Sequence, residues 1–240
     1  MQNIGATEYG SICETGKKLR TIPINELAQE DIVDIVDLFT KAALRAVQAG
    51  FDGVQLHLAY DWLLCRFVNL EYNQRTDQYG GTAENRVRII LEILQAIRLS
   101  TDLHISAKFT FFKEKTGDFA MAECTQICGL LSQAGIDSLE ILGEHSPREK
   151  GTAFEACYLD LALAAKAAGD VPIILTGNNH DIGNMERLLN GQGIEYFAMS
   201  RPLIREPGLP NRWSHGDRSK AKCISCGRCY GTYGKRCIFN

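Results

Sequence analysis

Strand-like and helical segments alternate along most of this chain of 240 residues. Short apolar runs of strand length lie at about 52–58, 104–110, 138–143, 171–177 and 196–200. Helical patterns lie at about 28–49, 83–99, 120–134, 155–168 and 181–190. Strands that are joined by helical crossovers form a parallel sheet with right-handed connections. The alternation therefore predicts an α/β fold with five parallel strands.

Polar side chains recur on one face of three of these strands. Gln55 and His57 lie opposite the apolar residues of their strand, and Lys108 and Glu140 take the same position in the next two. An open sheet that helices cover on both sides reads as continuously apolar. A polar face instead predicts the interior of a closed barrel, although a barrel of this kind has eight strands. We therefore predict a partial TIM (β/α)8 barrel.

Glycines mark the ends of several predicted helices. Gly135, Gly169 and Gly193 each follow a helical pattern. Glycine is common there because it adopts the left-handed conformation that often closes a helix. We expect all three to be left-handed caps.

Composition excludes several classes of partner. The net charge of −3 gives no electrostatic reason to bind nucleic acid or an anionic membrane. No apolar run reaches the roughly 20 residues that a membrane-spanning helix needs. The first residues lack the basic and apolar layout of a secretory signal. A cytoplasmic location is the resulting expectation.

The most informative run extends over thirty residues, His57 to Arg86, and reads HLAYDWLLCRFVNLEYNQRTDQYGGTAENR. A histidine at the end of a buried strand lies at the edge of a barrel where catalytic groups gather. The run resembles the flavin-binding barrel of the Old Yellow Enzyme family of NAD(P)H:flavin oxidoreductases. The resemblance covers about residues 25–240 and implies that the five strands are strands four to eight, with the first three βα units missing.

This resemblance implies an FMN-dependent oxidoreductase that uses NAD(P)H to reduce an activated alkene or a quinone-like acceptor. His57 and Tyr60 match the pair that binds the acceptor's oxygen. A tyrosine that often donates the proton is replaced by Trp62, whose indole N–H is not an acid near neutral pH.

The predicted cofactor site uses the loops after the last two strands. Barrels often bind a phosphate there through backbone N–H groups. The segments Thr176-Gly177-Asn178-Asn179 and Ser200-Arg201-Pro202 occupy these loops. The resemblance implies that the FMN-binding residues are Lys108, Gly177, Asn178, Ser200 and Arg201. Lys108 would lie beside the flavin ring, and Arg201 would bind the phosphate.

Other polar residues of the run are predicted to have a structural role. We expect Thr82 to cap the next helix. We expect the remaining residues to join the long loop by hydrogen bonds; these are Asn73, Arg75, Asp77, Tyr79, Glu84, Asn85 and Arg86.

Four cysteines lie close together near the end of the chain: Cys223, Cys226, Cys229 and Cys237. Four thiolates can bind a zinc ion or a [4Fe–4S] cluster. The tail is similar to that of relatives such as 2,4-dienoyl-CoA reductase, which carry an iron–sulfur cluster. An iron–sulfur cluster, zinc and metal-free thiols all remain open.

Residues 1–215 are predicted to form the partial FMN-binding barrel, and residues 216–240 a cysteine-rich tail. Two other functions remain open. The chain could be an inactive fragment or a subunit that needs a complementing chain with the other strands, or a metal-binding module on a partial barrel. The expected partners are NAD(P)H and a small acceptor molecule, with a homo-oligomer as a further possibility.

Overall fold

The computed structural model describes residues 26–60, 62–113, 118–144 and 155–239. Five strands form its sheet: β1 (Gly53–Leu58), β2 (His104–Phe111), β3 (Ser138–Gly143), β4 (Ile173–Leu175) and β5 (Tyr196–Phe197). Every neighbouring pair is parallel, and the strands follow one another in chain order. This order confirms the five-stranded parallel sheet, and it lacks the reversal that defines a doubly wound sheet.

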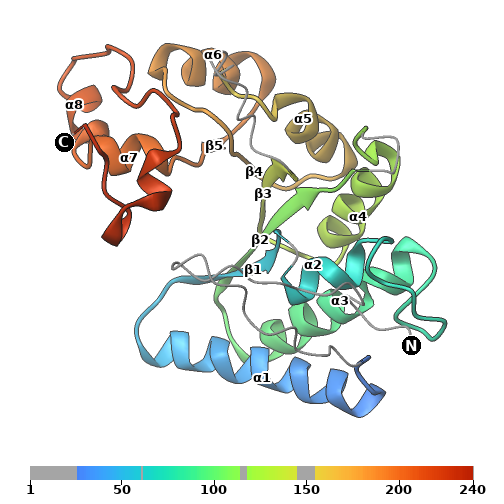
Figure 1. The fold of residues 1–240 in the computed structure, drawn as a ribbon. Coiled ribbons are helices and arrows are strands. Elements are labelled where there is room, and N and C mark those ends of the chain that lie inside the picture. Colours follow the sequence, from blue (N-terminus) through green and yellow to red (C-terminus); the bar gives the residue numbers. More distant parts are fainter. Residues whose placement is uncertain (1–25, 61, 114–117, 145–154, 240) are drawn as a thin grey trace.

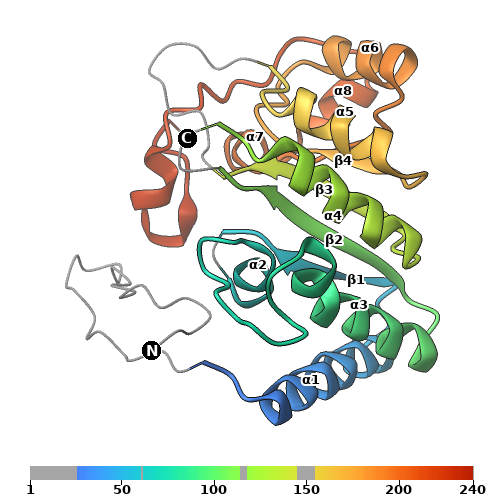
Figure 2. The ribbon, with the colours of Figure 1, turned by 90° about the vertical axis from the view of Figure 1, so that its right-hand side faces the viewer.

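The five predicted helices are present. They are α1 (Gln29–Gln48), α3 (Ala83–Ser100), α4 (Met121–Gln133), α5 (Leu159–Ala168) and α6 (Ile182–Gln192). Figures 1 and 2 show that they line up along one side of the curved sheet. The opposite side of the sheet faces the open interior of the arc in Figure 1. The chain therefore forms an α/β partial barrel, as predicted.

Several shorter elements were not predicted. They are α2 (Leu63–Val68), α7 (Arg201–Arg205), α8 (Leu209–Ser214) and two 3-10 turns at Arg228–Gly231 and Tyr233–Lys235. Each is too short to show a helical period in the sequence. Within the described ranges, no helix has the length and apolar character that crossing a membrane requires.

The two faces of the sheet differ as the sequence predicts. Ile105, Ala107 and Phe109 of β2 are fully buried on the helix side and belong to the main apolar core. Gln55 is exposed on the other face, and Lys108 is partly exposed there. The core thus lies between the sheet and its helices, and it leaves the polar face free to form a site.

One of the three predicted helix caps is wrong. Gly135 and Gly193 have φ of +83° and +63°, so both are left-handed as expected. Gly169 is extended, with φ of −169°. A Cβ atom at Gly169 would lie 2.3 Å from the hydroxyl oxygen of Ser132. Close packing of α5 against α4, and not a left-handed turn, therefore requires this glycine.

The strand boundaries also differ from the prediction. β4 and β5 contain three and two residues, fewer than the runs at 171–177 and 196–200 suggest. Apolar loop residues extended those runs. β2 continues to Phe111, so Lys108 lies inside the strand and not at its end.

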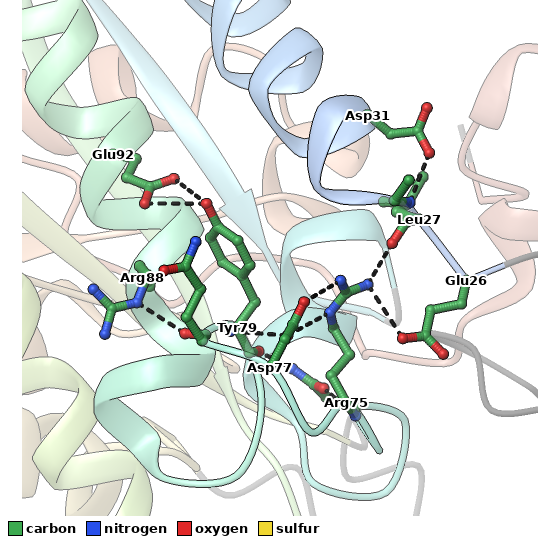
Figure 3. Close-up of polar contacts among 11 residues, drawn as sticks. Glu26, Leu27, Asp31, Arg75, Asp77, Tyr79, Arg88 and Glu92 are labelled. Atoms are coloured by element: carbon green, nitrogen blue, oxygen red, sulfur yellow. Dashed lines mark hydrogen bonds and ion pairs between the residues drawn. The ribbon is translucent and has the colours of Figure 1, made fainter.

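The long loop before α3 is held by its own polar side chains (Figure 3). Arg75 donates two hydrogen bonds to Asp77, at 2.9 and 2.5 Å, and one to the backbone oxygen of Leu27 at 2.7 Å. Asn73 donates to the backbone oxygens of Phe67 and Tyr79 at 2.6 and 2.7 Å, and its own oxygen accepts from the N–H of Arg75. The predicted structural role of these residues is confirmed.

The start of α3 shows the same agreement. The Thr82 hydroxyl accepts a hydrogen bond from the N–H of Asn85, so Thr82 is the predicted cap. The side chain of Arg86 is 1% exposed and donates to the backbone oxygens of Val68 and Gly81. Arg86 also forms an ion pair with Glu123 of α4. These contacts fasten the loop to α3 and α4.

Candidate active site

A pocket of about 280 Å³ lies where the strands end at the polar face. Six of the seven predicted catalytic and cofactor residues line it: Tyr60, Lys108, Gly177, Asn178, Ser200 and Arg201. They come from the end of β1, from β2 and from the segments after β4 and β5. The fold therefore brings together residues that are up to 141 positions apart in the sequence, from Tyr60 to Arg201.

Asn178 and Arg201 form one end of this pocket. Nη2 of Arg201 donates to Oδ1 of Asn178 at 3.0 Å. Asn178 is 6% exposed and has a φ of +54°, a conformation that asparagine tolerates better than most residues. Its Nδ2 is buried and has no hydrogen-bond partner within the described ranges. A buried donor costs free energy when it is unpaired, so this end of the pocket is suited to a ligand with acceptor oxygens.

Gly177 precedes them and turns the chain with φ of +110°. A Cβ atom there would lie 2.5 Å from the sulfur of Cys157 and 2.7 Å from the ring of Tyr158. The sequence analysis predicted that Gly177 is one of the residues that bind FMN. The packing of the residues just before α5 against the turn already requires a glycine here.

Glu140 lines the pocket and accepts hydrogen bonds from three other side chains. The sequence prediction gave Glu140 no role in binding or catalysis. Its Oε1 accepts from Nζ of Lys108 at 2.7 Å and from the hydroxyl of Thr176 at 2.8 Å. Its Oε2 accepts from Nε2 of Gln55 at 3.0 Å. Burial raises the pKa of Glu140, but the hydrogen bond and charge of Lys108, together with the hydrogen bonds of Thr176 and Gln55, lower it overall. The positive charge of Lys108 in the pocket is therefore paired with the carboxylate of Glu140.

His57 lies beside Tyr60 but is not among the residues that line the pocket. Their ring centroids are 6.0 Å apart, and Nζ of Lys108 lies 6.0 Å from the centroid of the Tyr60 ring. Burial and the charge of Lys108 lower the pKa of His57, although Glu140 opposes them. Burial raises the pKa of Tyr60. Both side chains are thus held in uncharged forms that can donate a hydrogen bond to an oxygen.

Other residues that line the pocket were missed by the sequence prediction. Tyr158 and His180 lie in its wall, and so does Tyr230 from the cysteine tail. Burial raises the pKa of Tyr158. No motif marks these residues, because they reach the pocket from the residue before α5, from the β4–α6 segment and from the tail. Trp62, by contrast, is 64% exposed at the start of α2.

The four cysteines of the tail line a second, smaller cavity of about 20 Å³. Arg201 and Arg205 share this cavity, and Nη1 of Arg205 lies 3.6 Å from the sulfur of Cys237. Among the described residues, no three or more His, Cys, Asp or Glu side chains have the arrangement of a metal site. The tail therefore brings the four thiols near one another without the geometry of a formed site.

The residues of the main pocket suit an anionic ligand with a polar ring. The unpaired donor of Asn178 and the guanidinium of Arg201 offer hydrogen bonds and charge to a phosphate. Oδ1 of Asn179 is a second buried atom without a partner, and it accepts hydrogen bonds such as those of sugar-like hydroxyls. The donor and acceptor set thus fits a flavin nucleotide.

Comparisons with known proteins agree with this geometry. The sequence pattern of the NADH:flavin oxidoreductase / NADH oxidase family matches residues 7–220. The NADH oxidase of Thermoanaerobacter brockii is 31% identical over 229 residues, which cover 90% of this chain and 35% of that protein. The bilirubin reductase of Clostridium symbiosum is 30% identical over 242 residues, which cover 92% and 64%.

Solved structures give the same result. Morphinone reductase in complex with tetrahydroNAD matches with a TM-score of 0.70 and 27% identity, over 90% of this chain and 60% of that protein. The chain therefore spans about a third to two thirds of the length of the relatives that it matches. It belongs to the NADH:flavin oxidoreductase / NADH oxidase family, the family that its sequence resembles.

Proposed function

We propose that this chain forms the FMN-binding and acceptor-binding half of an Old Yellow Enzyme-type oxidoreductase that uses NAD(P)H. The observation that carries this proposal is the buried, unpaired Nδ2 of Asn178 beside Arg201. Two relatives support it through their names, an NADH oxidase and a reductase in complex with tetrahydroNAD. FMN, when bound, supplies hydride transfer between the nicotinamide and the acceptor.

The proposed roles follow from the pocket. Arg201, Asn178, Ser200 and Gly177 would hold the phosphate end, and Lys108 would lie beside the ring. His57 and Tyr60 would donate hydrogen bonds to the acceptor's oxygen and draw electron density from its double bond. The acceptor would be an activated alkene or a quinone-like molecule, because both have an oxygen that can take these bonds.

Flavin binding and NADH oxidation test this proposal together. We expect the purified chain to bind FMN more tightly than riboflavin, with quenching of flavin fluorescence. We expect His57→Ala to slow the oxidation of NADH by a quinone while FMN affinity changes little. A chain that binds FMN no better than riboflavin would contradict the phosphate site, and an active His57→Ala variant would contradict the acceptor site.

A second proposal concerns the tail, where Cys223, Cys226, Cys229 and Cys237 would bind an iron–sulfur cluster or zinc. Its support is the single cavity that all four thiols line. Anaerobic purification followed by analysis of iron, sulfide and zinc distinguishes the two metals. A protein with neither metal would contradict this proposal and leave the FMN proposal intact.

A third proposal is that a complementing chain, or a second copy, completes the barrel. Among the described residues, β1 pairs with β2 alone, which leaves its other edge without a strand partner there, and exposed Gln55 lies on its polar face. Analytical ultracentrifugation of the chain with and without the separately expressed N-terminal half of a relative tests this. A chain that stays monomeric and gains no flavin affinity from that half would contradict it.

A further inference from the structure

The cysteine tail and the phosphate end of the main pocket share a wall. Arg201 lines both the main pocket and the cavity of the four cysteines. Tyr230, which follows Cys229, also lines the main pocket. The backbone N–H of Ala221 donates to the backbone oxygen of His180 at 2.8 Å, which fastens the tail to the segment after β4. A displacement of the tail would therefore change the pocket.

Ser225 makes the closest connection between the two. It lies between Cys223 and Cys226, and its backbone oxygen accepts from Nη1 of Arg201 at 3.3 Å. Its hydroxyl donates to Oδ1 of Asn178 at 3.3 Å and lies 3.2 Å from Nε2 of His180. Ser225 has a φ of +52°, which residues other than glycine rarely adopt. Such a conformation persists where surrounding contacts hold it.

These contacts fix the orientation of the Asn178 amide. Its oxygen accepts from two donors, the Arg201 guanidinium and the Ser225 hydroxyl. An amide whose oxygen faces two donors turns its NH2 group the other way. That group is the buried Nδ2, which has no hydrogen-bond partner among the residues that the structure describes. Ser225 thus helps to fix the direction in which the unpaired donor points.

We propose that Ser225 is a positioning residue of the anion site. Through Ser225, the cysteine tail is thermodynamically coupled to phosphate binding. The coupling is reciprocal, so a bound anion also holds the tail in place. This inference rests on the proposed FMN site and adds to it a segment outside the barrel strands. The ligand class is a phosphate monoester, because the site offers the guanidinium of Arg201 and the amide donor of Asn178.

The test compares FMN with riboflavin, which lacks the phosphate, in the full chain. Ser225→Ala removes the hydroxyl and keeps the backbone preferences of a non-glycine residue. We expect it to weaken FMN binding about threefold to tenfold and to leave riboflavin binding unchanged. The dissociation constant of riboflavin divided by that of FMN, both measured by flavin fluorescence, should fall by the same factor. Ser214→Ala, an exposed serine of α8, is the matched control and should leave the ratio unchanged.

The outcomes separate this inference from the proposed function. Equal weakening of both flavins in Ser225→Ala, or an unchanged ratio, would overturn the positioning role while FMN binding stands. A wild-type chain that binds no FMN would contradict the proposed function. Thermal unfolding in inorganic phosphate, against chloride of equal ionic strength, then decides. Greater stabilisation of the wild type and Ser214→Ala than of Ser225→Ala supports the inference, and equal or absent stabilisation overturns it.

Discussion

Two polar regions of this molecule differ in whether their buried polar atoms have hydrogen-bond partners. In the loop before α3, Arg75 and Asn73 have partners within the chain for their buried polar groups (Figure 3). In the pocket, Asn178 and Asn179 each keep one buried atom without a partner. Since an unpaired buried group costs free energy, a fold keeps it where a ligand or water can satisfy it. The paired groups hold the loop, and the unpaired atoms of Asn178 and Asn179 lie in the candidate site. Within the part of the chain that the structure describes, Thr110 also has one such atom outside this pocket, so an unpaired atom does not by itself mark a site.

This difference predicts opposite results of substitution in the two regions. Changes in the loop should lower the free energy of unfolding and affect binding only indirectly. Changes in the pocket should weaken binding with a small effect on stability. A loop variant that loses flavin affinity at full stability would break the comparison.

Arg75→Met should have the largest effect. The side chain of Arg75 is 3% exposed and its loss leaves Asp77 without the partner that lowers its pKa. We expect the free energy of unfolding to fall by about 2 to 3 kcal/mol, measured by urea denaturation. Lys41→Met is the control, because Lys41 and Asp37 form an exposed ion pair that should contribute less than about 0.5 kcal/mol. Equal effects of the two changes would contradict a structural role of the loop.

Arg201→Gln should have the largest effect on binding. It removes the positive charge that lies beside Asn178 and replaces a charge-assisted bond with a weaker one. We expect FMN to bind about 10- to 30-fold more weakly by fluorescence titration, with the stability changed by less than about 1 kcal/mol. Arg187→Gln, an exposed arginine of α6, should leave FMN affinity unchanged.

Asn178→Asp sharpens the comparison further. Aspartate tolerates the positive φ of this position and still accepts the hydrogen bond of Arg201. It replaces the unpaired donor with a negatively charged oxygen. We expect FMN affinity to fall about tenfold, because two like charges would meet, while urea denaturation shows no loss of stability beyond about 1 kcal/mol. Unchanged FMN affinity would show that Nδ2 does not face the phosphate.

The titration of His57 should show the smallest effect. Burial and the charge of Lys108 lower its pKa, so its NMR titration midpoint should lie below 6.5. An unfolded chain then binds the proton more readily, and His57 adds a little stability above pH 6.5 that is lost as the pH falls toward the lowered pKa. Lys108→Met should raise the midpoint, and Glu140→Gln should lower it. A wild-type midpoint above pH 6.5 would contradict the partly buried position of His57 beside Lys108.

Much of the site could be predicted from the sequence, for identifiable reasons. Strand periodicity placed Gln55, His57, Lys108 and Glu140 on one face, and the hydrogen bonds to Glu140 confirm that Gln55, Lys108 and Glu140 meet there. The position of Gly177 after a strand predicted a turn, and its φ of +110° agrees. Both signals are local, because period and turn chemistry depend on neighbouring residues. The binding roles of these residues remain predictions.

Other features could not be predicted, because they depend on contacts between distant segments. Gly169 was expected to be a left-handed cap, yet the nearby side chain of Ser132 on α4 decides its role. Glu140 was placed on the polar face without a role, since its importance comes from contacts with Lys108 on β2 and with Thr176, the residue after β4. Tyr158 lines the pocket from the position just before α5, and no pattern in the sequence indicates this.

The sequence by itself determined the parallel α/β sheet, its polar face and the family, because each of these depends on local periodicity and on a contiguous motif. The tertiary structure alone decided which buried polar groups have partners. It paired Lys108 with Glu140, left Nδ2 of Asn178 unpaired and placed Ser225 of the tail against Arg201. Hydrogen bonding between residues far apart in the chain depends on distances of about 3 Å, which only the packed fold can set.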